Sequence, residues 1–103
     1  MVQISIPEDQ VSDFCRRHGV RRMWFFGSVL RDDFRPESDV DVLVEFASDF
    51  HWTLRELIQM EEELSGILGR KVDLVDRTSV ERSENYIRRR HILDSLEPVY
   101  VAG

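Results

Sequence analysis

Two aspartates that stand one residue apart are the residues best suited to chemistry in this sequence of 103 residues. Asp39 and Asp41 begin a segment rich in β-branched residues that follows a turn-forming stretch, which predicts a strand. Side chains alternate along a strand, so both carboxylates are expected on one face. Like charges this close repel unless a cation lies between them, and Mg²⁺ prefers carboxylate oxygens together with substrate phosphates. The pair therefore predicts a metal site that acts on phosphate groups.

A Gly-Ser turn supplies the second half of such a site. The apolar run that ends at Phe26 is followed by Gly27 and Ser28, and a short helix is expected from Ser28 to Leu30 or Arg31. A helix that starts after a glycine turn presents free backbone N–H groups and a positive dipole end to an anion. The Ser28 hydroxyl and the Arg31 guanidinium are further candidates for binding phosphate.

A third carboxylate, Asp73, lies in the segment KVDLVD, which also reads as a strand. Alternation places Val72 and Leu74 on one face and Asp73, with Lys71 and Val75, on the other. A buried carboxylate without a partner is costly, so Asp73 either joins the metal site or faces solvent at a sheet edge.

Together these residues resemble the active-site signature of minimal nucleotidyltransferases, a family within the DNA polymerase β-like superfamily. The signature is Gly-Ser, ten residues, Asp-x-Asp and a later aspartate on another strand. Here it appears as Gly27-Ser28, ten residues, Asp39-Val40-Asp41 and finally Asp73. Relatives often continue the first motif as Gly-Ser-x-Ala-Arg-Gly, whereas this chain has Asp32 in place of the last glycine.

The resemblance implies Mg²⁺-dependent nucleotidyl transfer with ATP as the nucleotide donor. Asp39 and Asp41 are expected to hold two Mg²⁺ ions, and Asp73 to complete the second metal site and accept the proton of the acceptor. The catalytic and metal-binding set is thus Asp39, Asp41 and Asp73, and the phosphate-binding set is Gly27, Ser28 and Arg31. Positioning and charge neutralisation dominate this kind of catalysis.

The acceptor is expected to be another protein, because so short a chain leaves little material for an acceptor pocket. Relatives of this size act as antitoxins beside a HEPN-domain toxin, which they are thought to silence by adenylylating a tyrosine, so the resemblance implies a hetero-oligomer with such a toxin. Two alternatives stay open: transfer to a small molecule such as an aminoglycoside, and an antitoxin that acts by binding alone.

Composition narrows the class of protein. The length predicts one nucleotidyltransferase domain over residues 1–103, and 42% apolar residues indicate a globular chain. A formal net charge of −6 disfavours a nucleic-acid polymer as the main partner and is compatible with a basic protein. No apolar run is long enough for a membrane span, and the lone Cys15 excludes an internal disulfide, so we expect a cytosolic protein without a membrane partner.

These residues must be positioned by a small α/β (α+β) domain. Strands are predicted near 22–26, 39–46, 71–76 and 98–101, and helices near 7–18, 53–68 and 79–96. Alternating helices and strands with short connections indicate a mixed sheet of about four strands with helices packed on it, the nucleotidyltransferase fold. In the second helix, Leu54 and Ile58 are expected in the apolar stripe and Met60 on the solvated side. In the last helix, Tyr86, Ile87, Leu93 and Leu96 are expected to face inward.

Overall fold

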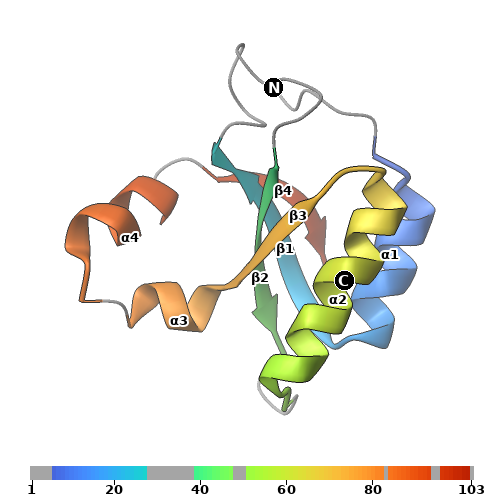
Figure 1. Cartoon of the computed structure of the whole chain (residues 1–103), viewed down its shortest axis with the longest axis horizontal. Coiled ribbons are helices and arrows are strands. Elements are labelled where there is room, and N and C mark those ends of the chain that lie inside the picture. Colours follow the sequence, from blue (N-terminus) through green and yellow to red (C-terminus); the bar gives the residue numbers. More distant parts are fainter. Residues whose placement is uncertain (1–5, 28–38, 48–50, 83, 94–95, 103) are drawn as a thin grey trace.

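The chain folds into one β-sheet with helices against both of its faces (Figure 1). The computed structural model describes residues 6–27, 39–47, 51–82, 84–93 and 96–102. The elements are, in chain order, α1 (Glu8–Arg17), β1 (Val20–Phe26), β2 (Val40–Phe46), α2 (Leu54–Leu68), β3 (Val72–Asp76), α3 (Arg77–Glu81), α4 (Tyr86–Leu93) and β4 (Glu97–Val101). Within these ranges, no helix is both long and apolar enough to cross a bilayer.

The four strands pair in the order β3-β2-β1-β4. β1 runs antiparallel to β2 and to β4, whereas β2 and β3 are parallel and are connected through α2. Parallel neighbours require such a crossover, because the chain has to return to the same end of the sheet. The predicted α/β fold with a mixed four-stranded sheet is confirmed, and each predicted strand agrees with the observed one to within two residues.

The first two helices begin and end at the residues that the sequence indicates. Pro7 occupies the N-cap position of α1, and Gly19 follows the helix with φ 67°. The Thr53 side chain accepts a hydrogen bond from the backbone N–H of Glu56 at 3.2 Å, which satisfies one of the unpaired donors of the first turn of α2. Gly69 ends α2 in the left-handed conformation, φ 68°.

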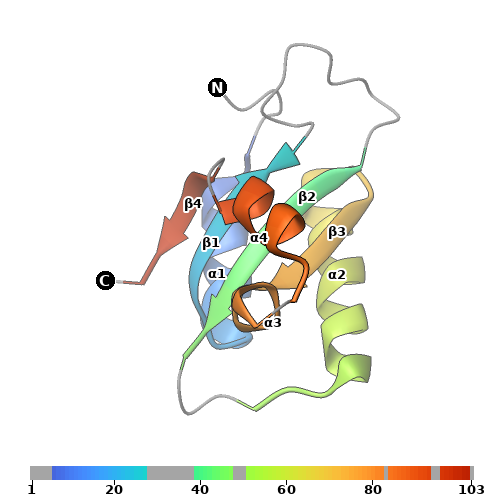
Figure 2. The same cartoon turned by 90° about the vertical axis from the view of Figure 1, so that its left-hand side faces the viewer.

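Strand alternation divides the apolar residues between two cores, one on each face of the sheet. In the turned view, α3 and α4 lie in front of the sheet, and α1 and α2 lie behind it (Figure 2). The larger core, against α1 and α2, includes Phe14, Cys15, Met23, Phe25, Val40, Val42, Val44, Met60, Leu64 and Val72. The smaller core, against α3 and α4, consists of Trp24, Phe26, Leu43, Val80 and Ile92.

The orientation of α2 differs from the prediction. Met60 is 1% exposed, whereas Leu54 and Ile58 are 69% and 50% exposed. At 3.6 residues per turn, Ile58 lies well outside the buried stripe of Met60, Leu64 and Leu68. Leu54 lies near the angular position of Leu68, but it is exposed as the first residue of the helix. The spacing of the apolar residues indicates that the helix has an apolar side. Which of these residues are buried depends on how the helix docks against β3.

Two side chains of α2 also cover the outer edge of β3. The Ser65 hydroxyl accepts a hydrogen bond from the backbone N–H of Val72 at 3.0 Å, and a Glu61 carboxylate oxygen accepts one from Leu74 at 2.9 Å. Nothing in the sequence indicated this role for Glu61. These bonds satisfy backbone donors that an edge strand otherwise leaves open.

The predicted single helix over 79–96 is wrong, because the structure has two shorter helices there. Asp76, 7% exposed, starts α3 early by accepting hydrogen bonds from the backbone N–H and the hydroxyl of Ser79, at 3.3 and 3.1 Å. Residues 82–85 then separate α3 from α4. The polar residues at this break favour turns and helix caps over helix interiors.

The break changes which side chains of this region are buried. Leu93 and Leu96 pack against the smaller core, as predicted. Ile87 is 79% exposed, which contradicts its predicted inward orientation, and the side chain of Tyr86 lies outside the described part of the structure. Helix α4 therefore presents the side chain of Ile87 away from the core, beside the face of the sheet that carries the aspartates.

Candidate active site

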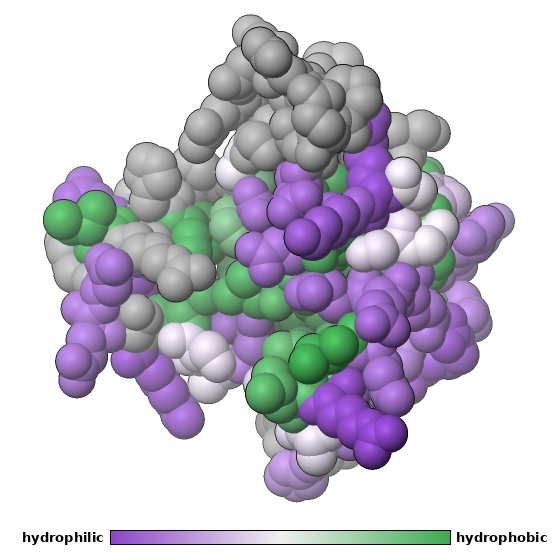
Figure 3. Space-filling view, viewed as in Figure 1, coloured by the Kyte–Doolittle hydropathy of each residue, from purple (hydrophilic) through white to green (hydrophobic). Residues whose placement is uncertain are grey.

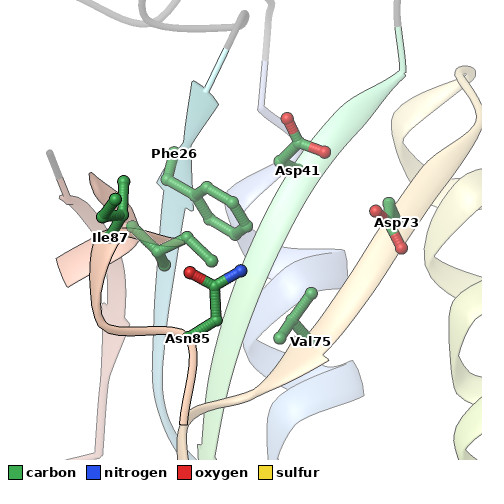
Figure 4. A pocket seen from close by; sticks show the side chains of 7 residues that line it. Phe26, Asp41, Asp73, Val75, Asn85 and Ile87 are labelled. Carbon is green, nitrogen blue, oxygen red and sulfur yellow. The ribbon is translucent and has the colours of Figure 1, made fainter. Parts of the chain in front are cut away.

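Asp41 and Asp73 are paired residues on neighbouring parallel strands. The β2–β3 register places Asp41 opposite Asp73, with Val42 opposite Leu74. Val42 and Leu74 belong to the larger core, so by alternation the two carboxylates project from the other face, toward α3 and α4. Figure 4 shows both side chains rising from that face of their strands. Neighbouring strands lie about 4.8 Å apart, so two negative charges are held side by side.

Gly27 brings the turn after β1 against the Asp41 carboxylate. Phe26 pairs with Asp41 across β1 and β2, and Gly27 follows with φ 75°. A Cβ atom at Gly27 would collide with Oδ2 of Asp41 and lie 3.2 Å from its Cγ. Glycine is therefore required here twice, once for its positive φ and once for space. The predicted closeness of the glycine turn to the acidic strand is present in the structure.

The remaining predicted site residues are only partly described. Asp39 is exposed and lies immediately before β2, and it is not among the residues that line the pocket beside Asp41. Ser28, Arg31 and Asp32 lie outside the described residues. The structure thus brings together Gly27, Asp41 and Asp73, while the contributions of the other predicted residues stay predictions.

Glu45 is another carboxylate on β2, the strand of Asp41, and it has a positively charged partner. It lies farther along β2 than Asp41 and forms an ion pair with Arg22 of β1, with 3.5 Å between Oε2 and Nε. Two same-face steps along the strand, roughly 13 Å at strand rise, separate Glu45 from Asp41, too far for both to bind one metal ion. Its partner across the sheet agrees with that exclusion.

A pocket of about 570 Å³ opens beside the aspartates. It is lined by Phe26, Asp41, Asp73, Val75, Asn85, Ile87 and Ile92. Its volume lies in the range of small-molecule sites, and its lining is mostly apolar with few polar groups, as is usual for such sites. The space-filling view shows apolar surface in the hollow between α4 and the strands (Figure 3).

The donor set of this pocket suits Mg²⁺ when a phosphate-bearing ligand completes its coordination. Within the described ranges, no three His, Cys, Asp or Glu side chains form a ready metal centre. Mg²⁺ in nucleotide enzymes is usually held by one or two carboxylates together with substrate phosphates, not by an all-protein cage. Asp41 and Asp73 supply such a pair, and the missing Cβ of Gly27 leaves room for the Asp41 carboxylate.

Sequence reasoning missed most of the pocket wall. Phe26 and Val75 share a face with the aspartates by simple alternation, so the strand pattern contained the signal that they border the site. Asn85 and Ile87 carried no such signal, because they were assigned to one long helix. Their position at the pocket results from the break between α3 and α4.

Known proteins are similar to this chain over much of its length. A family model described as a nucleotidyltransferase domain matches residues 8–96. The protein adenylyltransferase MntA of Thermococcus cleftensis is 42% identical over 64 residues, which are 62% of this chain and 63% of that protein. A provisionally named protein adenylyltransferase of Methanocaldococcus jannaschii is 38% identical over 62% of this chain and 67% of its own length. The chain therefore spans about two thirds of the length of these curated relatives.

Solved structures share the fold over most of the chain. A provisionally assigned minimal nucleotidyltransferase is 33% identical with a TM-score of 0.66, covering 88% of this chain and 87% of that one. A chain of a toxin–antitoxin complex with AMP-PNP has a TM-score of 0.71 at 19% identity, covering 94% and 75%. A chain of a complex between a tri-AMPylated HEPN toxin of Shewanella oneidensis and an MNT antitoxin has a TM-score of 0.62 at 20% identity, covering 92% and 70%. At these identities, the two complexes show the fold alone.

Proposed function

Because this chain belongs to the nucleotidyltransferase family, we propose that it is a Mg²⁺-dependent protein adenylyltransferase, the antitoxin that adenylylates a tyrosine of a partner HEPN-type toxin. The observation that carries the proposal is the pairing of Asp41 with Asp73 at the mouth of a pocket of about 570 Å³. Relatives named protein adenylyltransferases support the type of reaction. The similar fold of chains in toxin–antitoxin complexes supports the type of partner.

The candidate residues have three tasks in the reaction, namely metal binding, phosphate binding and acceptance of a proton. The Mg²⁺ ions would be held by Asp41 of β2, by Asp39 immediately before β2, and by Asp73 of β3. The triphosphate of ATP would be held through these ions. Gly27, Ser28 and Arg31 bind the β- and γ-phosphates, and the missing side chain of Gly27 also leaves room for the Asp41 carboxylate. Mg²⁺ held by these carboxylates would neutralise charge on the phosphates and so lower the barrier to displacement. We assign these roles to the whole chain as one domain, residues 1–103.

The transfer of AMP is a displacement at the α-phosphorus of ATP. The acceptor oxygen of a tyrosine forms the new P–O bond, and the bond to the bridging oxygen breaks, so that pyrophosphate leaves. Asp73, the more accessible of the two paired aspartates, accepts the phenolic proton. Its exposed side chain at the pocket leaves room for a side chain from another protein. The buried, unpaired Cys15 is compatible with this reaction taking place in the cytosol.

The test uses the full chain, a purified partner toxin, labelled ATP and MgCl₂, with the product identified by mass spectrometry. A mass increase of one AMP group on a toxin tyrosine is expected with the wild type, and none after chelation of Mg²⁺. Asp73→Asn is expected to lose the modification, whereas Glu45→Gln on the neighbouring strand retains it.

A pull-down and a toxin-neutralisation assay on the same samples separate an enzyme from a binder. Asp73→Asn should still bind the toxin, because a stable protein interface is far broader than one side chain. If the bound variant neutralises the toxin as well as the wild type does, catalysis is irrelevant and inhibition by contact alone is the function. If AMP appears on a small molecule and never on the toxin, the protein acceptor is wrong.

A further inference from the structure

Asp73 lies on a strand that has a neighbouring strand on one side only. β3 is at the edge of the sheet, and it pairs in parallel with β2. The Val40 N–H donates a hydrogen bond to the carbonyl oxygen of Lys71 at 2.8 Å, so the backbone groups of Lys71 point toward β2. Because this direction alternates along a strand, those of Asp73 also point toward β2, whereas those of Val72 and Leu74 point away from the sheet.

Helix α2 supplies an acceptor to each of these two outward N–H groups. Oε2 of Glu61 accepts the hydrogen bond of the Leu74 N–H at 2.9 Å, and the Ser65 hydroxyl oxygen accepts that of the Val72 N–H at 3.0 Å. Four residues of a helix span roughly 6 Å, and two residues of a strand span roughly 6.6 Å. Because these spacings match, α2 takes the place of a neighbouring strand at both positions.

The two acceptors differ in strength. The Ser65 hydroxyl donates its own proton to the carbonyl oxygen of Glu61 at 2.7 Å, which leaves its oxygen free to accept from Val72. A carboxylate accepts a backbone hydrogen bond more strongly than a neutral hydroxyl does. The contact between Glu61 and Leu74 is therefore expected to be the stronger of the two.

We infer that Glu61 is a positioning residue for the proposed transfer reaction, because it fixes the peptide group that joins Asp73 to Leu74. With Ser65 bound to Val72, the backbone is held on both sides of Asp73, and its carboxylate stays opposite Asp41. Mg²⁺ demands near-ideal coordination geometry, so a small displacement of one carboxylate weakens its binding. This inference rests on the proposed function, since that function assigns Asp73 to metal binding and proton transfer.

Variants of Glu61 separate the hydrogen bond from the negative charge. Glu61→Gln keeps the length of the side chain and an acceptor oxygen but removes the charge. Glu61→Asp keeps the charge but is shorter by one methylene group, and Glu61→Ala removes both. If the hydrogen bond positions Asp73, Glu61→Gln should resemble the wild type, and the other two variants should resemble each other. Glu62→Ala removes a carboxylate from the exposed neighbouring position and should change nothing.

The backbone contact can be measured without ATP, metal or partner. Amide hydrogen exchange, followed by NMR on the full chain, reports how firmly the Leu74 N–H is held. Glu61→Ala and Glu61→Asp should raise the exchange rate at Leu74 roughly tenfold, the scale of one hydrogen bond to a charged group, and Glu61→Gln should not. The rate at Val44, in the central strand β2, should change far less. An equal rise at Val44 would assign the effect to general destabilisation and overturn the inference.

AMP transfer to the purified toxin is then measured against the concentrations of MgCl₂ and toxin, well below the unfolding temperature. Glu61→Ala should lower kcat roughly tenfold to a hundredfold and raise the MgCl₂ concentration for half-maximal activity, with the KM for the toxin unchanged. The stability control is Ile67→Ala. Ile67 packs against the larger core from the same helix but takes no part in the two hydrogen bonds. This control should lower the unfolding temperature without changing kcat or the Mg²⁺ dependence.

The possible failures can be told apart. If the wild type transfers no AMP, the proposed function fails and the positioning role fails with it. If the wild type is active and Glu61→Ala keeps its kcat and Mg²⁺ dependence, only the positioning role is wrong. A loss shared by Glu61→Gln would assign the effect to charge, and a loss matched by Ile67→Ala would assign it to stability. Either result also overturns the inference, as does an unchanged exchange rate at Leu74 in Glu61→Ala.

Discussion

The Asp41 carboxylate occupies the space that a side chain at Gly27 would need. A Cβ atom there would overlap Oδ2 of Asp41, and the backbone of Gly27, φ 75°, is one that other residues adopt only with strain. Both halves of the sequence signature therefore meet at one contact. Gly27 belongs to the Gly-Ser motif, and Asp41 is the second aspartate of the Asp-x-Asp motif. Because the position of Asp41 depends on the absence of a side chain at Gly27, the two motifs are not independent of each other.

Gly27→Ala is predicted to abolish nucleotidyl transfer while the chain still folds. The positive φ should cost about 1–2 kcal/mol of unfolding free energy, and the new methyl group should displace the Asp41 carboxylate. Transfer activity and thermal unfolding measured on the same samples check both effects. A variant that retains near-normal activity contradicts the assignment of this contact to the site.

Two other glycines serve as controls for that variant. Gly69 has φ 68°, and no atom lies within 4 Å of the position that a Cβ would take there, so Gly69→Ala should carry the strain without any loss of activity. Gly66 lies inside α2 with open space around it, so Gly66→Ala should be neutral or stabilise the helix by about 0.5–1 kcal/mol. Loss of activity in either control would indicate that stability, and not the Asp41 contact, governs the result for Gly27.

Replacing the paired aspartates should remove Mg²⁺-dependent activity without unfolding the protein. Asp41→Asn combined with Asp73→Asn removes the proposed metal ligands and also the repulsion between two neighbouring charges. We expect no detectable transfer, and a stability in metal-free buffer within about 1 kcal/mol of the wild type. Addition of MgCl₂ with ATP should raise the unfolding temperature of the wild type only. Stabilisation of the double variant to the same extent would place the metal elsewhere.

The contact between α1 and α2 should make stability depend on acidic pH. Glu63 of α2 accepts hydrogen bonds from Arg17, and His18 Nε2 lies 3.1 Å from its Oε1. The Arg17 hydrogen bond holds the pKa of Glu63 below its usual value of 4.5. A carboxylate whose pKa is lowered on folding stabilises the protein above the unfolded pKa, and this contribution is lost as pH falls through the lowered value.

Glu63→Gln should therefore destabilise the protein above about pH 5 and converge with the wild type in more acidic buffer. The difference should stay below about 1 kcal/mol, because both partners are partly exposed to solvent. Urea unfolding between pH 3 and 7 measures it, and Glu62→Gln, at the exposed neighbouring position, is the control. A constant difference over the whole pH range would assign the effect to packing instead of charge.

Cys15 should be unreactive in the folded protein. Its side chain is fully buried, and burial raises the pKa of the thiol to about 12. Alkylation at pH 8 should be negligible in native buffer and rapid in denaturant, because the thiolate is the reactive form and has to be exposed. Mass spectrometry after timed labelling checks this. Complete labelling of the native protein within minutes would indicate that α1 opens readily from the sheet.

The parts of the site that the sequence predicted correctly are those encoded by local patterns. Strand alternation placed Asp73 on the face opposite Val72 and Leu74, and the structure adds that it lies beside Asp41. The register between β2 and β3 was not predictable, because the strands are connected through a whole helix and their alignment depends on how the core packs. The resemblance to a known family supplied the pairing that the residues alone left open.

The parts that were missed depend on tertiary contacts. Helical periodicity identified α2 but misplaced Met60 and Ile58, because its buried stripe is set by docking against the sheet. The α3–α4 break moved Ile87 from a predicted core position to the pocket wall. Turn-forming residues near Asn85 were present in the sequence, yet the apolar spacing around them favoured a continuous helix. A pocket wall built from such a break becomes visible only in three dimensions.

The hydrogen bonds from Val72 and Leu74 to side chains of α2 have a consequence for self-association. Sheets grow when an open edge recruits another strand, and that recruitment is the first step of amyloid-like aggregation and of continuous intermolecular sheets. At β3 the outward backbone donors of these two residues are already taken by Ser65 and Glu61. These hydrogen bonds protect β3 from pairing with a strand of another molecule. The exposed carboxylate of Asp73 on this strand therefore stays available to solvent and ligand instead of being enclosed in a fibril.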